Sequence, residues 1–246
     1  MKTIKNRLLV LTIFLATLLL TACIKIIKGE GNVVKQEVCN ETFNKIGLSI
    51  NCTINYHQTE ERPHVEIEID DDLLPFLDIH VEKGVLVVKK KKEYRNMHFK
   101  ATKCVINAYS NDLREIDIAG GSNFNIVTPF STDELEISLA GSVSVNFLHN
   151  IDINELEIEA SGSSKVTANE GCIKRCSLSL AGNNCTELDK VISEVMDISI
   201  AGSGKAMVSV SKELKYDIAG SGEILYKGTP SISGDISGSG KISAVE

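Results

Sequence analysis

Residues 200–204 read Ile200-Ala201-Gly202-Ser203-Gly204, and the same five residues return as Ile218-Ala219-Gly220-Ser221-Gly222. Both copies belong to a longer series in which a small residue precedes glycine. The series has seven members, spaced by 21, 21, 20, 20, 18 and 18 residues: Ala119-Gly120, Ala140-Gly141, Ser161-Gly162, Ala181-Gly182, Ala201-Gly202, Ala219-Gly220 and Ser237-Gly238. A fixed glycine that recurs at so regular an interval predicts a solenoid, in which each repeat stacks on the last.

The residues before each pair alternate strictly. When the small residue is numbered zero, positions −1, −3 and −5 are apolar, as in Leu139, Ile137 and Leu135, and positions −2 and −4 are polar. Positions +5 and +7, for example Val145 and Phe147, resume the apolar series after the glycine. Each repeat is therefore expected to be a strand, a tight corner, a second strand and a variable turn. We predict an all-β fold, a parallel right-handed β-helix (β-solenoid) with rungs of about 20 residues.

The glycines are expected at the corners because glycine adopts positive φ without steric cost. These structural corner glycines are Gly120, Gly141, Gly162, Gly182, Gly202, Gly220 and Gly238. Position +2 is Ser or Asn in six repeats, as in Ser203 and Asn183. We expect these side chains to hydrogen-bond from rung to rung. A catalytic or ligand-binding serine row is the alternative, but no histidine accompanies it.

The N-terminus has the features of an export signal. A short basic segment ending at Arg7 precedes an uncharged run from Leu8 to Leu20, which is too short to span a bilayer as a stable helix. The ending Leu20-Thr21-Ala22-Cys23 resembles the bacterial lipobox, and Cys23 is the expected site of lipid attachment. An uncleaved anchor or an ordinary signal peptide is the alternative.

These features divide the chain into three parts. Residues 1–22 are predicted to be a lipoprotein signal peptide and residues 23–37 a lipid-anchored tether. Residues 38–246 are predicted to form the solenoid, with irregular rungs over 38–112 and regular small-Gly repeats over 113–246. Strands are expected at 65–69, 77–81 and 85–88 within the irregular part, where apolar and polar residues alternate.

The charge of the mature chain is strongly negative. Removal of residues 1–22 takes three of the 26 basic residues and none of the 33 acidic ones, which leaves 23 against 33 and a formal net charge of −10. Such a chain has no general attraction for nucleic acid, and we expect no nucleic-acid partner. Cysteines 39, 52, 104, 172, 176 and 185 show no disulfide-scaffold or zinc-site spacing, so a structural or disulfide role is expected.

Two charged groups could bind a ligand. The outward acids of the first strands form a stripe, to which three roles are open: solvation, a calcium site and paired acid–base chemistry on polysaccharide. Its members are Glu115, Asp117, Glu136, Glu157, Glu159, Asp197, Asp217 and Asp235. The run Lys89–Lys92, with Arg95 and His98 nearby, is either an exposed loop or a contact for lipid headgroups or acidic polymers. Solvation and an exposed loop are favoured, and no metal site or cofactor is predicted.

The sequence resembles the auto-transporter adhesin head GIN domain family of exported Bacteroidota proteins. The resemblance rests on Phe43–Ile46, Val65–Leu73 and Gly84–Val88, and on the repeated Ile-Ala-Gly-Ser-Gly. It covers roughly residues 32–243 and implies a β-solenoid without catalytic residues. The chain departs from the pattern at Asn183-Asn184-Cys185, where Ser-Gly is usual, and in its number of cysteines.

Together these features predict a lipid-anchored cell-envelope protein, an outer-membrane lipoprotein. Whether it faces the periplasm or the cell surface is left open. We expect an adhesin-like or ligand-binding solenoid that is not an enzyme. Its partners are expected to be the membrane, through the lipid on Cys23, and a glycan or envelope polymer. The alternatives are a structural or assembly module of the envelope and, more distantly, a polysaccharide-active enzyme.

Overall fold

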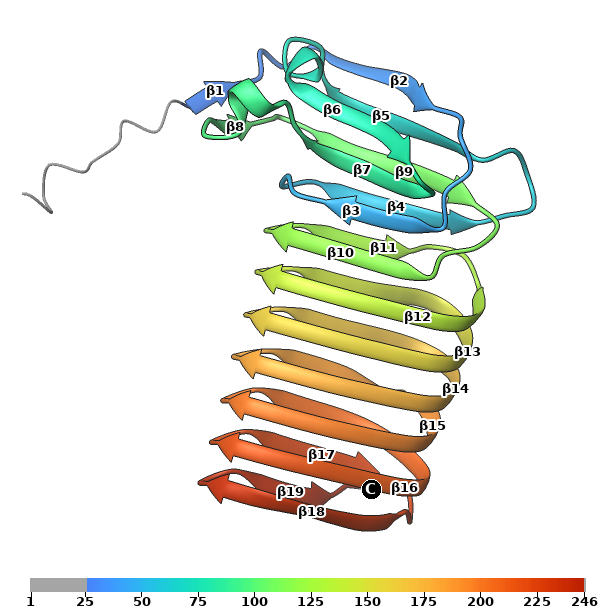
Figure 1. Ribbon diagram of the computed structural model, residues 1–246, viewed down its shortest axis with the longest axis vertical. Helices are drawn as coiled ribbons and strands as arrows, with labels where there is room; N and C mark the ends of the chain where they lie inside the picture. Colours follow the sequence, from blue (N-terminus) through green and yellow to red (C-terminus); the bar gives the residue numbers. More distant parts are fainter. Residues whose placement is uncertain (1–25, 246) are drawn as a thin grey trace, which may run out of the picture.

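The small-Gly pairs stack in register along one edge of a β-solenoid (Figure 1). The computed structural model describes residues 26–245. Parallel pairing aligns Gly120, Gly141, Gly162, Gly182, Gly202, Gly220 and Gly238 in a single column. The β-solenoid of stacked parallel rungs, predicted from the sequence period, is thereby confirmed.

The middle of the coil consists of four long strands, each of which begins just after one corner glycine and ends at the next, and shorter strands form the rungs at both ends. The strands of the coil are β10 (Glu115–Gly120), β11 (Asn123–Ile126), β12 (Phe130–Gly141), β13 (Ser144–Gly162), β14 (Lys165–Gly182), β15 (Cys185–Gly202), β16 (Lys205–Gly220), β17 (Glu223–Lys227), β18 (Ser231–Gly238) and β19 (Lys241–Ala244). The four long strands are β13 to β16. The rungs shorten where the register slips, after Phe147 between β13 and β14 and after Leu188 between β15 and β16. The variable turn therefore absorbs the shortening of the repeat toward the C-terminus.

The core of the coil is aliphatic and continuous. Residues at −1 and −3, such as Leu139 and Ile137, are buried, and they face residues at +5 and +7, such as Val145 and Phe147. A fully buried side chain of this kind contributes about 1.5–3 kcal/mol relative to an exposed one. Each rung can bury its inward side chains only against its neighbours, which is why the rungs fold as a stack.

The corners from Gly141 onward combine positive φ with close contact to the preceding rung. Gly202 has φ +125°, and a Cβ built on it would lie 2.6 Å from the carbonyl oxygen of Gly182. All seven corner glycines have positive φ. From Gly141 onward, a Cβ would lie 2.4–2.6 Å from the carbonyl oxygen of the preceding corner glycine.

The expected side-chain ladder at position +2 is replaced by backbone hydrogen bonds. The amide of Ser203 donates to the carbonyl of Gly182 at 2.9 Å, and the corresponding amides of the other repeats donate in the same way. The side chains at this position are exposed. The buried position is +3, where Asn184 accepts a hydrogen bond from the Ser164 amide at 2.9 Å and donates to the carbonyls of Ala160 and Ala181. Because of the tight turn at the glycine, the side chain at position +2 points outward and the side chain at position +3 points inward.

Residues 33–110 build a cap on the N-terminal end of the coil. Its strands are β2 (Val33–Cys39), β3 (Lys45–Leu48), β4 (Thr53–Gln58), β5 (His64–Asp70), β6 (Leu77–Glu82), β7 (Val85–Lys90) and β9 (Cys104–Ser110), with a 3-10 turn η1 (Leu74–Phe76). Strands β3 and β4 form a rung on β10 and β11, and β7 and β9 form a further parallel layer on β3 and β4. Strands β2, β5 and β6 then pair antiparallel and cover the sheet edges.

The segment expected as a tether is partly folded onto the cap. Strand β1 (Ile26–Lys28) pairs parallel with β8 (His98–Lys100), beside the 3-10 turn η2 (Lys92–Tyr94), and β2 begins at Val33. The two-stranded sheet of β1 and β8 lies at one side of the cap (Figure 1). Alternation alone did not reveal β1, because so short a strand cannot show a period.

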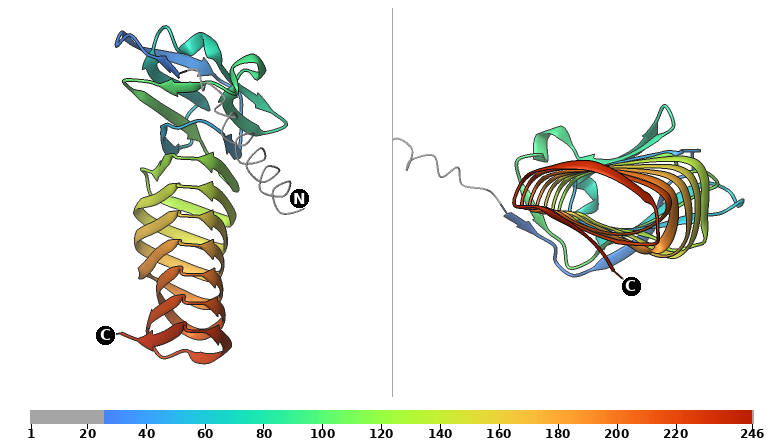
Figure 2. Two further views of the ribbon diagram at one scale, coloured as in Figure 1. Left: turned by 90° about the vertical axis from the view of Figure 1, so that its left-hand side faces the viewer. Right: turned by 90° about the horizontal axis from the view of Figure 1, so that it is seen from below.

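The opposite end of the solenoid is open. Strand β18 pairs with β16, and β19 pairs with β17, each on one side only within the described residues. Figure 2 shows the flattened coil end-on, with the cap at its far end. Within residues 26–245, no helix is long and apolar enough to cross a membrane.

Candidate functional site

The outward side chains of the strands before each corner form one continuous polar surface, which we call the first-strand face. It consists of two columns, which in-register pairing aligns rung by rung. One column holds Glu115, Glu136, Glu157, Ser177, Asp197, Lys215 and Ser233, and the other Asp117, Ser138, Glu159, Ser179, Ser199, Asp217 and Asp235. All eight acids of the sequence-predicted stripe therefore lie on this face.

Two shallow depressions lie on the first-strand face. One, of about 290 Å³, is bordered by Glu136, Glu157, Ser177 and Asp197. The other, of about 280 Å³, is bordered by Asp117, Ser138, Glu159 and Ser179. Both fall below the usual range of about 300–1,000 Å³ for small-molecule pockets, and the side chains around them are mostly polar. Such a surface suits contact with an extended polar ligand better than enclosure of a small one.

Ion pairs at the borders of the face neutralise part of its charge. Arg175 donates two hydrogen bonds to one carboxylate oxygen of Glu155, at 3.0 and 2.6 Å, and Lys215 contacts Glu213 at 3.0 Å. Lys45 pairs with Glu115, and that hydrogen bond raises the pKa of the lysine. These pairs are solvent-exposed, so each contributes little to stability. Most of the acids remain available to solvent or to a ligand.

The carboxylates of the face are arranged in rows and do not converge on a point. Among residues 26–245, no group of three or more His, Cys, Asp or Glu side chains could hold a metal ion.

A second polar column, which the sequence analysis did not single out, runs along the outside of the other strands. Asn55 bridges Asn107 and Asn125 at 3.1 and 3.0 Å, and Asn146 continues the ladder from Asn125 at 3.0 Å. Thr167 extends it by donating to Asn146. Position +6 is Asn in two successive repeats, and this signal could have revealed the ladder. Because the amides bond to one another, this column stabilises the stack.

The six described cysteines are free thiols and form no common site. Cys52 and Cys104 lie directly before the paired residues Thr53 and Val105 of neighbouring strands, and the adjacent Cys104 thiol together with burial raises the pKa of Cys52. Burial raises the pKa of Cys176 to about 12, which keeps it as a neutral thiol in the core. Cys172 is exposed and contacts Asp152.

The cap contains a small, partly apolar cavity of about 140 Å³. Its walls include Ile69, Leu73, Phe99 and Cys104, with Lys90 and His98 also contributing. This volume is well below that of a typical ligand pocket. Cys23, the expected lipid site, lies outside the described residues.

The coil and its rows of outward polar side chains define a β-solenoid with one continuous polar face. Residues 42–230 match the family model described as "Putative auto-transporter adhesin, head GIN domain", and the chain belongs to this family. The resemblance inferred from the repeats is therefore confirmed. Comparison with curated proteins finds no significant match.

Solved structures from Bacteroidota share the fold over the whole of their length. A structure from Parabacteroides distasonis described as a putative lipid binding protein is 26% identical in sequence. The alignment covers 90% of this chain and the whole of that protein, with a TM-score of 0.73. A putative adhesin from Parabacteroides merdae is also 26% identical over the same shares, with a TM-score of 0.67. A putative adhesin from Bacteroides fragilis, at 22% identity, covers 89% of this chain and all of its own, with a TM-score of 0.80, and shows likeness of fold alone. None of the three is described as an enzyme.

Proposed function

We propose that this protein is a lipid-anchored, adhesin-like protein of the cell envelope, an outer-membrane lipoprotein that binds glycan or another envelope polymer without catalysis. The observation that supports the proposal is the first-strand face, where acidic side chains and serines repeat rung after rung on the stacked strands. Neighbouring strands lie about 4.8 Å apart, so the face offers a ladder of hydrogen-bonding groups to an extended polymer.

Two observations support the proposed attachment to the cell envelope. Cys23 directly follows Thr21-Ala22 at the end of an export-type segment, and the family and similar structures are described as adhesins or a lipid-binding protein. Bacterial lipoproteins carry several acyl chains, which is enough for stable anchoring. The cavity in the cap is too small for a complete acyl chain. We therefore propose that this protein carries lipid as a covalent anchor on Cys23 and does not bind a free lipid in the cap.

A clustered glycan array tests this proposal. Binding through a shallow face is weak at each contact and becomes measurable through avidity. Protein clustered on streptavidin should therefore bind envelope glycans that the monomer does not bind. Release of reducing ends from a bound glycan, abolished by Glu136→Gln with Glu157→Gln, would contradict the non-catalytic proposal.

One observation favours a second function, assembly of the envelope. Ile232 and Ile236 on β18 are 43% and 39% exposed, and the outer edge of β18 is unpaired within the described residues. An open, apolar strand edge is a template for pairing with another chain. Concentration-dependent oligomers that Ile236→Lys disrupts, together with no binding on the array, would favour assembly over adhesion.

A further inference from the structure

We propose that the lobe formed by residues 26–28 and 91–100 is a membrane-docking surface that binds anionic phospholipid headgroups. The proposal rests on the lipid anchor at Cys23 and adds a second, electrostatic contact to it. This lobe, which we call the basic lobe, comprises β1, η2 and β8.

The topology places the basic lobe next to the proposed anchor. Strand β1 pairs with β8 through Ile26–His98, Ile27–Phe99 and Lys28–Lys100, and the amide of Gly29 donates to the carbonyl of Lys100 at 3.0 Å. Only three residue steps separate Cys23 from Ile26, a span of at most about 10 Å. A lipid on Cys23 would therefore hold the basic lobe within roughly a Debye length of the headgroups.

The lobe presents cations that have no carboxylate partner. Lys28, Lys92, Arg95 and Lys100 are exposed, and none of them forms an ion pair with the residues that the structure describes. In the coil, by contrast, many lysines are matched to acids, such as Lys165 to Glu187 and Lys212 to Glu194. Unpaired cations are thus concentrated where the chain leads to the anchor, although the mature chain as a whole is acidic.

Contacts to the cap hold these cations in place. The ammonium of Lys90 donates to the carbonyls of Arg95 and Met97 at 2.9 and 2.7 Å, and that of Lys91 donates to the carbonyl of Pro75 at 2.6 Å. The ring of Phe76 packs against those of Tyr94 and Phe99. Two lysines of the run therefore brace the lobe, and the remaining cations stay free for a ligand.

An apolar side chain accompanies the cations. Ile26 is 58% exposed, the largest exposure among the large hydrophobic residues that the structure describes. Cations around an apolar group are the usual composition of a surface that lies in the headgroup region of a bilayer. The combination favours a membrane over a soluble acidic polymer, because a polar polymer would gain no free energy by covering the Ile26 side chain.

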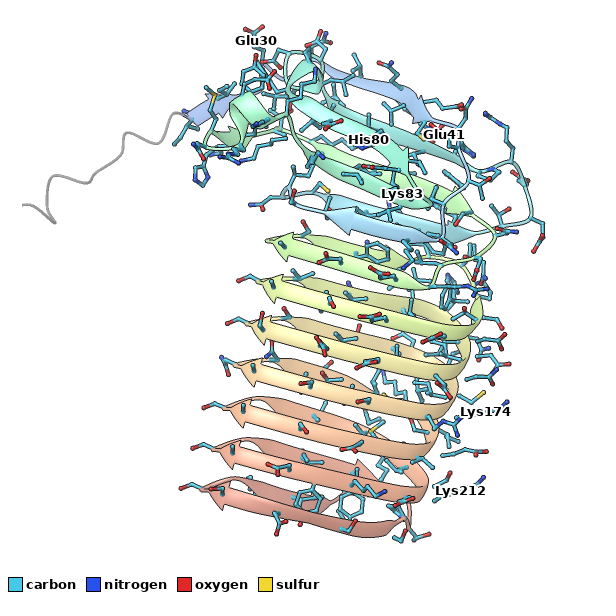
Figure 3. The ribbon with its side chains drawn as sticks, in the orientation of Figure 1. Glu30, Glu41, His80, Lys83, Lys174 and Lys212 are labelled. Atoms are coloured by element: carbon cyan, nitrogen blue, oxygen red, sulfur yellow. The ribbon has the colours of Figure 1, made fainter. Side chains whose placement is uncertain are left out.

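Nearby acids limit the attraction. Glu93 lies within the lobe, and Glu30, Asp71 and Asp72 occupy the adjoining turns, where Asp71 accepts a hydrogen bond from Asn32. Figure 3 shows Glu30 on the upper rim of the cap, whereas β8 pairs with β1 at one side of the cap (Figure 1). We therefore expect docking that orients an anchored molecule but is too weak to retain an unanchored one.

The absence of tryptophan makes a clean test possible. Asn96→Trp, an exposed site between Arg95 and Met97, introduces a single reporter into the full-length lipidated protein. A matched reporter, Ser233→Trp, lies on β18 at the far end. Both proteins are reconstituted into vesicles of phosphatidylcholine alone or with phosphatidylglycerol, each containing a lipid with a spin label at headgroup depth.

Docking predicts that quenching at residue 96 is at least about threefold stronger on the anionic vesicles and is lost in high salt. The variant Lys28→Gln, Lys92→Gln, Arg95→Gln, Lys100→Gln should abolish this difference. A control with the same loss of charge, Lys174→Gln, Lys190→Gln, Lys212→Gln, Lys241→Gln, should retain it. Lys174 and Lys212 project from the coil well away from the cap (Figure 3).

Equal quenching on both kinds of vesicle, or quenching that survives in the lobe variant, would overturn the proposal. A change at residue 96 caused by a soluble acidic polysaccharide, with no response to anionic vesicles, would overturn it in favour of polymer binding. Failure of the anchor would be seen separately, as absence of fatty-acid label on Cys23 before any vesicle is made, and would remove the premise of docking.

Discussion

At each corner of the coil, one glycine meets two separate steric demands. Its φ lies in the left-handed region, and from Gly141 onward a Cβ built on it would overlap the carbonyl oxygen of the preceding corner glycine. The second demand comes from the stacking of rungs. A substitution at an internal corner should therefore cost more than strain in φ alone would explain.

The glycines allow these two costs to be separated. Gly202→Ala should lower the free energy of unfolding by more than about 3 kcal/mol, because strained φ and overlap with the Gly182 carbonyl add together. Gly31 also has positive φ, but no atom lies within 4 Å of a Cβ built there, so Gly31→Ala should cost about 1 kcal/mol. Urea denaturation measures both, and equal losses would contradict the close-approach account.

Position +3 is expected to matter more than position +2. Asn184→Ala should cost about 1–3 kcal/mol, because it leaves the Ser164 amide and two buried carbonyls without their partner. Ser203→Ala should change stability by less than about 0.5 kcal/mol, because the hydrogen bond at that position belongs to the backbone. If thermal unfolding showed a larger loss of stability for Ser203→Ala than for Asn184→Ala, the side chains at +2 would form the stabilising ladder after all.

The sequence period predicts the column of corner glycines well. The alternation of apolar residues also indicates that the side chain at position +3 points inward. Alternation that places Val145 and Phe147 inside places Val143 inside as well. Serine is more frequent at +2, and frequency alone suggested a ladder there. How often serine occurs at a position does not show whether its side chain points inward or outward, because exposed and buried turns both favour small polar residues.

Among the elements, the strands of the cap were easier to predict than their partners. Alternation over 65–69, 77–81 and 85–88 correctly indicated β5, β6 and β7. It could not indicate that β5 pairs antiparallel with both β2 and β9, because these partners lie far from β5 in the chain. Local patterns fix which side of a strand is buried but not which edge it joins.

The two ends of the coil should differ in local stability. Amides of β14, paired on both sides over most of the strand, should exchange with solvent at least about 100-fold more slowly than those of β18 and β19. Hydrogen exchange followed by mass spectrometry at low protein concentration measures this ratio. Equally slow exchange in β18 would mean that its outer edge is covered in solution.

For the molecule as a whole, the proposed docking surface and the proposed binding face lie in different parts of the structure. The basic lobe lies at the cap, and the coil that carries the first-strand face extends away from it (Figure 1). A lipid at Cys23 would thus project the face from the membrane. The proposed lipobox is an interpretation of the sequence alone, whereas the pairing of β1 with β8 is a long-range contact that the sequence did not reveal.

The anchor is tested by Cys23→Ser. Lipidation requires the thiol, so the variant should incorporate no labelled fatty acid and should remain uncleaved or become soluble. Metabolic labelling followed by membrane fractionation measures both outcomes. Normal labelling of the variant would contradict the lipoprotein assignment, and Ser203→Ala serves as a lipidated control.

The central claim is that the first-strand face binds the ligand. Ser177→Lys with Ser179→Lys would place two long side chains in its two depressions. Ser142→Lys with Ser163→Lys adds the same charge at exposed corners outside the face. Biolayer interferometry of clustered protein on an array-positive glycan should show at least about tenfold weaker binding for the first pair and unchanged binding for the second. Equal affinity of both pairs and the parent would contradict the claim.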